Sequence, residues 1–101
     1  MSTLYEYFGL IIYFFSNEHE PIHVRAKCEN RIVKAEIFIK DGKIIKIKIK
    51  PDGRNIPLKG SEIKKFNEIL KHYAFDITQK WFEYFVLHKK IKRVKITKRL
   101  K

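Results

Sequence analysis

The 101-residue sequence has little of what several classes of protein require. It contains one cysteine, Cys28, so an internal disulfide and any cysteine-based metal or redox motif are excluded. The apolar run at residues 8–15 is far shorter than the roughly 20 residues that cross a bilayer, and no positive charge precedes it as in a signal peptide. The sequence therefore predicts a cytoplasmic protein without membrane contact, in which Cys28 is a small buried side chain.

Acidic residues are also scarce, and they are unevenly spread. Lysine and arginine number 23 against 11 aspartates and glutamates, which gives a formal net charge of +12. Residues 89–101 hold eight of the basic residues and no acidic one, so two-thirds of the excess charge lies in this segment. Such a balance favours a polyanionic partner, either nucleic acid, an anionic surface or an acidic protein. With 45% hydrophobic residues the chain is too apolar for a disordered tail, and we expect a single globular domain over residues 1–101.

Residues 1–50 predict a four-stranded antiparallel sheet. Residues 7–15 are apolar on both faces, as in a central strand, and Gly9 would mark a bulge or a close backbone approach. Residues 22–29 alternate between apolar side chains and a polar set that contains His23 and Arg25, which is typical of a strand with one buried face.

The last two predicted strands, residues 31–39 and 43–50, form a hairpin whose register follows from its apolar pattern. A two-residue loop would pair Ile37 with Lys46 and place lysines among core residues. A three-residue loop, residues 40–42, pairs Ile37 with Ile45 instead and keeps one face apolar. We therefore predict the three-residue loop, with Glu36 opposite Lys46 and a glycine at positive φ in the turn.

Residues 51–60 predict a connector and residues 61–90 two helices. Ser61 is the expected N-cap of the first helix, and a second helix is expected to begin around Asp76 or Thr78, since either residue can cap it. Residues 91–101 form a basic tail that could add a short strand to a sheet edge. The predicted fold is α+β, an antiparallel four- to five-stranded sheet with two C-terminal helices packed on one face.

One segment, residues 15–25, gathers the reactive side chains. Pro21 makes it a loop that leads into a strand. A metal-independent ribonuclease needs a base, an acid and a cation for the phosphate. The candidates for these roles are His19, Glu20, His23 and Arg25. A metal site needs three or four ligands, and the arginine would oppose a cation, so we expect no metal and no cofactor. The alternative is that these side chains only complete a hairpin.

A non-catalytic nucleic-acid binder needs only a basic surface, because phosphate contacts supply affinity without reading sequence. If the second, third and fourth predicted strands are neighbours, their polar side chains form one continuous basic face. Phe38 or Tyr13, if exposed, could add base stacking. Together with the tail, this face provides the candidate contact residues Lys27, Lys34, Lys46, Lys48, Lys50, Lys92, Arg93 and Lys95.

The order of these features resembles domain-of-unknown-function family 4160, whose members are small bacterial proteins. The resemblance covers about residues 5–85 and rests on the YFGLII strand, the His-and-Pro loop NEHEPIH, the Asp41-Gly42 turn and Trp81. The family pattern has a second proline and a further histidine where this sequence has Ile22 and Arg25. The resemblance implies a suspected toxin–antitoxin pairing, and therefore an acidic cognate protein as partner and RNA as target.

Three hypotheses follow for the function. We expect the protein to engage RNA, or another polyanion, through the basic sheet face and tail. Cleavage of that RNA by the histidine-containing segment is a second hypothesis. The third is a protein-interaction module that binds a small acidic partner, in which the histidines have only a structural role.

Overall fold

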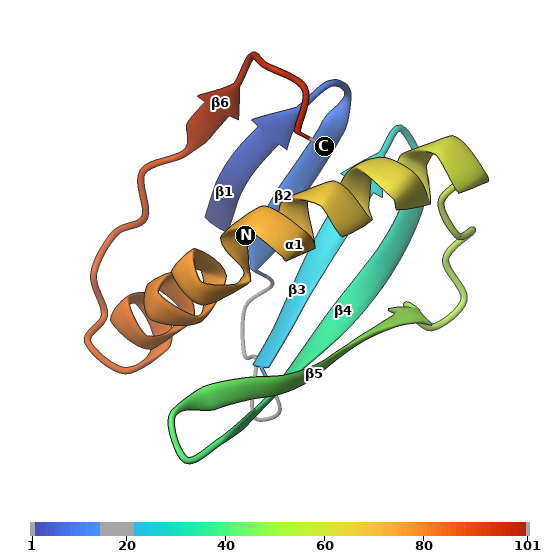
Figure 1. The fold of residues 1–101 in the computed structure, drawn as a ribbon. Coiled ribbons are helices and arrows are strands. Elements are labelled where there is room, and N and C mark those ends of the chain that lie inside the picture. Colours follow the sequence, from blue (N-terminus) through green and yellow to red (C-terminus); the bar gives the residue numbers. More distant parts are fainter. Residues whose placement is uncertain (1, 15–21, 101) are drawn as a thin grey trace.

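The structure, a computed structural model, describes residues 2–14 and 22–100 (Figure 1). These residues form six strands and one helix. In chain order the elements are β1 (Ser2–Tyr7), β2 (Leu10–Phe14), β3 (Ile22–Cys28), β4 (Arg31–Lys40), β5 (Lys43–Pro51), α1 (Gly60–Phe85) and β6 (Val94–Ile96). The strands make one sheet in the order β5-β4-β3-β2-β1-β6, antiparallel except for the β1–β6 pair. The α+β class is confirmed, but the prediction of two helices and of at most five strands is wrong.

The predicted single strand that begins at Tyr7 is instead interrupted by a turn, and β1 and β2 form a hairpin. Tyr7 pairs with Leu10, and the two residues between them, Phe8 and Gly9, have φ angles of 43° and 89°. Positive φ at both central residues is the geometry of the type I′ turn, which matches the twist of a tight hairpin. Gly9 therefore marks a reversal of the chain and not a bulge within a strand.

The hairpin of β4 and β5 also differs from its predicted register. Lys40 pairs with Lys43 across a two-residue turn, and beyond it a bulge leaves one residue of β5, Ile45, without a partner. This bulge shifts the pairing, so that Ile37 lies opposite Ile47 and Glu36 opposite Lys48. Beyond the bulge the predicted and observed registers differ by two residues, so residues 46–50 keep their predicted faces, because the assignment repeats every two residues. Before the bulge the prediction is wrong: Ile44 pairs with Ile39 and shares its face, whereas alternation had placed it on the opposite one.

The helical region is continuous through the predicted break. Thr78 donates its hydroxyl hydrogen to the carbonyl of Phe75 (2.7 Å), and Asp76 bonds to side chains of other residues, so neither caps a new helix. At the other end Lys59, and not Ser61, is the N-cap. The carboxylate of Glu62 accepts the backbone N–H of Lys59 (2.8 Å), which satisfies a donor that helix geometry leaves unpaired.

The core lies between α1 and one face of the sheet, which we call the inner face (Figure 1). The helix packs mainly over β2 and β3. Alternate residues of β3 point into this core as predicted, and Val24 and Ala26 are fully buried. On α1 the buried residues include Phe66, Ile69 and Ile77.

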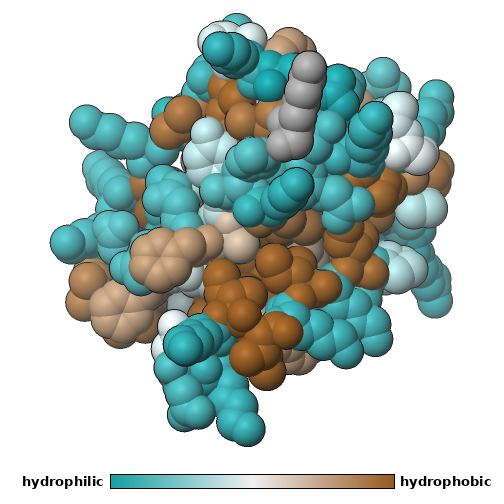
Figure 2. Space-filling view, in the orientation of Figure 1, coloured by the Kyte–Doolittle hydropathy of each residue, from teal (hydrophilic) through white to brown (hydrophobic). Residues whose placement is uncertain are grey.

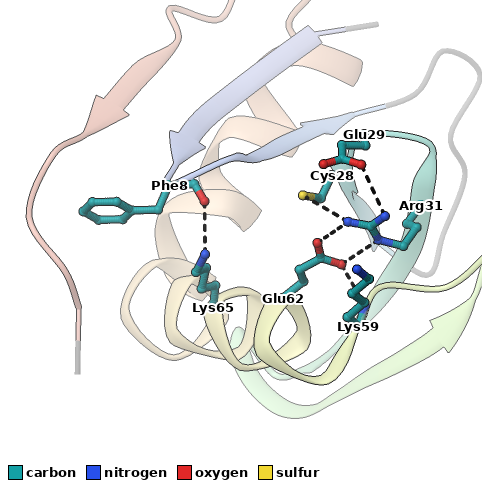
Figure 3. A network of polar contacts seen from close by, with 7 residues as sticks. All are labelled: Phe8, Cys28, Glu29, Arg31, Lys59, Glu62 and Lys65. Atoms are coloured by element: carbon teal, nitrogen blue, oxygen red, sulfur yellow. Dashed lines mark hydrogen bonds and ion pairs between the residues drawn. The ribbon is translucent and has the colours of Figure 1, made fainter.

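Polar contacts fix the helix to the sheet at its first turn (Figure 3). Arg31, just after the β3–β4 turn, donates two hydrogen bonds to the carboxylate of Glu62 and one to the sulfur of Cys28 (3.8 Å). The bonds from Arg31 hold the pKa of Glu62 far below its usual range. Burial raises the pKa of the thiol of the half-buried Cys28, which disfavours the nucleophilic thiolate form.

The C-terminal segment adds β6 to the edge of the sheet beside β1. Leu100 donates its backbone N–H to the hydroxyl of Tyr7 (2.8 Å), which in turn donates to the carboxylate of Glu68 (2.7 Å). Arg99 donates two hydrogen bonds to the same carboxylate (2.7 and 3.1 Å). Bonds from Arg99 and Tyr7 lower the pKa of Glu68 to about 2. A short edge strand was one of the sequence-based expectations, but its place beside β1 was not.

Candidate nucleic-acid interface

The face of the sheet away from α1, the outer face, carries most of the candidate residues. Residues that are cross-strand neighbours share a face, so the register places His23 beside Glu36 and Lys48, and Arg25 beside Lys34 and Lys50. The three strands β3, β4 and β5 are neighbours, as the continuous basic face requires. We define the lysine surface as the outer-face residues Lys27, Lys34, Lys46, Lys48 and Lys50.

Glu36 lies at the centre of this outer face and is only 8% exposed. One carboxylate oxygen lies 2.5 Å from Nζ of Lys50, and the other lies 3.0 Å from Nε2 of His23. Hydrogen bonds from Lys50 and then from His23 hold the pKa of Glu36 below its usual range, although burial opposes this shift. The carboxylate therefore stays charged at neutral pH and neutralises part of the surrounding positive charge.

Arg25 has a carboxylate partner from the connector that follows β5. Its Nε donates to Asp52 (3.0 Å), and both side chains are largely buried. The neighbouring Tyr13 is only 3% exposed, so it presents no ring face for stacking on a base. Burial raises the pKa of Tyr13, against the opposing effect of Arg25.

Other cations of the lysine surface have no ion pair with an acidic residue in residues 2–14 and 22–100. These are Lys27, Lys34, Lys46 and Lys48, of which the last two are exposed. Lys46 lies over the ring of Phe38, with Nζ 5.9 Å from its centroid. Phe38 is half-buried and remains the aromatic side chain of the outer face with an accessible ring.

The basic tail lies at the other end of the sheet. β5 and β6 are the two edge strands, with four strands between them. Lys95 pairs in register with Glu6 of β1, and Arg93 lies 3.5 Å from the Glu6 carboxylate. Lys92 precedes these residues and is exposed. The sheet face and the tail, both named as candidate contact regions, are thus two separate basic regions with β2 and β1 between them.

The structure brings together only part of the predicted catalytic group. His23 and Arg25 lie on the outer face two residues apart, each against a carboxylate. His19 and Glu20 lie outside the described residues. Within the described ranges no cluster of three or more histidine, cysteine, aspartate or glutamate side chains could hold a metal ion. Histidine is the side chain most often used in general acid–base catalysis, and this one is held by a glutamate.

Sequence reasoning did not identify Asp52 as the partner of Arg25. Asp52 follows Arg25 by 27 residues and lies in a predicted connector, so nothing in the local pattern couples the two. Glu36 was placed on the correct face but opposite Lys46, whereas Lys48 is its cross-strand neighbour and Lys50 its ion-pair partner. The alternation of charges on β5 was the available signal, and the bulge at Ile45 made it point to the wrong lysine.

A family comparison covers this surface. The model of the family described as Domain of unknown function (DUF4160) matches residues 9–82, about three-quarters of the chain. The chain belongs to this family. The DUF4160 match contains the whole lysine surface and ends before the basic tail. No match was found among curated proteins or among solved structures.

The sequence also predicted that this DUF4160 chain makes no contact with a membrane. Across residues 2–14 and 22–100, no helix is both long enough and apolar enough to span a bilayer.

Proposed function

We propose that the protein binds single-stranded RNA on the outer face of β3, β4 and β5, through the lysine surface. The observation that carries this proposal is the cluster of lysines without acidic partners on a face that no described helix or strand covers. Lys34, Lys46 and Lys48 supply cations for phosphates, and the half-exposed Phe38 supplies a ring on which one base can stack. The open face of a sheet suits single-stranded RNA, because the unpaired bases of the RNA can turn toward the protein.

The positions of the acidic residues support a restricted path for the RNA. Glu36 and Asp52 neutralise charge near His23, Lys50 and Arg25, so the strongest positive field lies toward Lys46 and Lys48 at the β5 edge. The tail is a separate cationic region and makes a secondary contribution in this proposal. Binding depends on phosphate contacts and is therefore salt-dependent and weakly selective for sequence.

Paired charge-neutralising variants test the proposal. Lys46→Gln/Lys48→Gln removes two cations of the lysine surface, and Lys64→Gln/Lys71→Gln removes two exposed cations of α1 on the opposite side of the sheet. Affinity for a labelled RNA of about 12 nucleotides, within the span of known single-strand sites, is measured by fluorescence anisotropy over a range of salt concentrations. We expect the first variant to lower the slope of log affinity against log salt by about 1.4, which is about 0.7 for each lost phosphate contact.

The helix variant is expected to keep the wild-type slope, because its lysines do not face the RNA. Equal losses in the two variants would show a non-specific effect of net charge and would contradict the proposal. Wild-type affinity that barely changes with salt would contradict it as well.

Cleavage is tested in the same samples with a His23→Ala variant. Intact RNA after incubation, with and without EDTA, is the result expected for a binder in which His23 is held by Glu36 as a structural pair. EDTA-resistant cleavage that the variant loses would instead assign a catalytic function to His23.

A further inference from the structure

An apolar groove lies on the other side of the sheet, between α1 and the β4–β5 hairpin. It is about 400 Å³ in volume. Its floor and walls include Ile39 and Ile44 from the hairpin and Phe75, Trp81 and Phe82 from the second half of the helix. The groove shares no residue with the lysine surface, and it opens on the inner face.

The groove exists because one helix is too narrow to cover a sheet of this width. α1 packs mainly over β2 and β3, so the inner face of β4 and β5 extends beyond it (Figure 1). An apolar sheet face is stable when another element buries it, and a second helix is one way to do so in an α+β fold. Two helices were predicted from apolar spacing and from possible caps at Asp76 or Thr78, but the described residues after α1 contain only the short strand β6.

The side chains that border the groove are unusually exposed for their type. Phe75 is 67% exposed, Phe82 is 47% exposed, and Ile39 is 43% exposed. Figure 2 shows apolar atoms gathered on this side of the molecule, around the second half of α1 and the hairpin below it. Apolar side chains that cluster in this way mark interaction sites more often than isolated ones do.

The charge of the surroundings indicates what kind of partner fits. The described residues that line the groove carry no charge, so charge acts on a partner here through the field of the whole chain. The whole chain carries +12, so a second copy of it would meet strong repulsion, whereas an acidic partner would be attracted.

We propose that this groove binds an amphipathic helix of an acidic partner protein, which takes the place of the second helix. Its apolar stripe would pack against Ile39, Phe75 and Phe82, and its acidic side chains would be attracted by the net positive charge of the chain. This is the helix-in-groove mode of recognition, in which apolar residues at helical spacing supply the anchors. The groove and the RNA-binding surface lie on opposite faces, so the two proposals stand or fall independently.

Two synthetic peptides of about 18 residues, long enough to form a helix, test the groove directly. Both contain the same leucines and glutamates. One has the leucines at helical spacing, and in the other the same residues are shuffled so that no stripe forms. Binding of each labelled peptide to the full chain is measured by fluorescence anisotropy. We expect the striped peptide to bind about tenfold more tightly than the shuffled one, because only the stripe can fill the groove.

The chain offers a matched pair of variants for this measurement. Phe82 borders the groove and Phe8 lies in the β1–β2 turn, and each phenylalanine is 47% exposed. We expect Phe82→Ser to weaken the striped peptide at least about fivefold, as for loss of an aromatic anchor, and Phe8→Ser to change it less than about twofold. Neither variant is expected to alter RNA affinity, and circular dichroism checks that both are folded.

Three results would overturn the proposal. Equal binding of the striped and shuffled peptides would show that charge alone attracts them. Equal losses in Phe82→Ser and Phe8→Ser would place the contact elsewhere. Sedimentation that showed a dimer of wild type, and a monomer of Phe82→Ser, would show that a second copy covers the groove.

Discussion

At the scale of single residues, three carboxylates of α1 join the helix to the sheet. Glu62 binds Arg31, Glu68 binds Tyr7 and Arg99, and Asp76 accepts a hydrogen bond from Tyr5. Helical periodicity placed the Glu68 position outside the apolar stripe, and the Asp76 position was interpreted as a cap. Neither contact follows from a pattern of apolar residues, because the donors to each carboxylate come from distant parts of the chain that only the tertiary fold brings near.

The low pKa of Glu68 makes stability depend on pH. Its pKa is about 2 in the folded protein and about 4.3 in an unfolded chain, so the folded state favours the charged form. The resulting stabilisation is complete above the unfolded value and is lost as the pH falls through about 4 toward 2. Glu68→Gln should therefore lower the Tm at pH 7 and leave it nearly unchanged at pH 2, as measured by thermal unfolding.

The same measurement on Glu83→Gln is the control, since this glutamate of α1 has no ion pair with a described residue. We expect its Tm to stay close to that of wild type at both pH values. A Glu68→Gln variant with a constant Tm deficit from pH 7 to pH 2 would mean that its stabilisation is not electrostatic.

At the scale of elements, the sequence was sufficient to predict which side chains share a face of a strand, but it was insufficient to predict the geometry of the turns. The alternation of residues 22–28 and 46–50 placed the apolar and lysine-bearing faces of β3 and of most of β5 correctly, because burial selects one face of a strand. The turns depended on local conformations that apolar patterns do not encode. Asp41 and Gly42 both have positive φ (53° and 77°), which makes a two-residue turn possible, and a bulge restores the apolar pairing beyond it.

The bulge leads to a prediction about deletions in β5. Removal of Ile45 should leave every other pair of the hairpin intact, because this 62%-exposed residue has no partner opposite it. We expect its deletion to change the free energy of unfolding by less than about 1 kcal/mol, as for a surface change that alters no buried contact. Removal of Lys48 should instead turn Ile49 to the outer face and Lys50 to the inner one, at a cost of about 3 kcal/mol or more.

Urea denaturation of the two deletion variants measures both free energies. Similar losses in the two variants would mean that the bulge at Ile45 supports the strand, for example by setting the twist of β5, and would contradict this account of the register.

At the scale of the whole molecule, the charges form two regions with different surroundings. The sequence located the basic residues and left the adjacency of β3, β4 and β5 as a condition, and it could not show that the tail returns to the opposite edge. That placement depends on the parallel pairing of β6 with β1, more than 80 residues away in the chain, and on the bonds from Leu100 and Arg99 to Tyr7 and Glu68. Long-range pairings of this kind leave no periodic signal.

The most direct test of RNA binding is an amide NMR titration of the full chain with a short single-stranded RNA. The account predicts that the largest chemical-shift changes fall on the outer-face positions Lys34, Lys46 and Lys48, with smaller changes at β6 and none around Phe75 and Phe82. Changes centred on the groove or on the tail, or no changes at all, would contradict the assignment of RNA binding to the lysine surface.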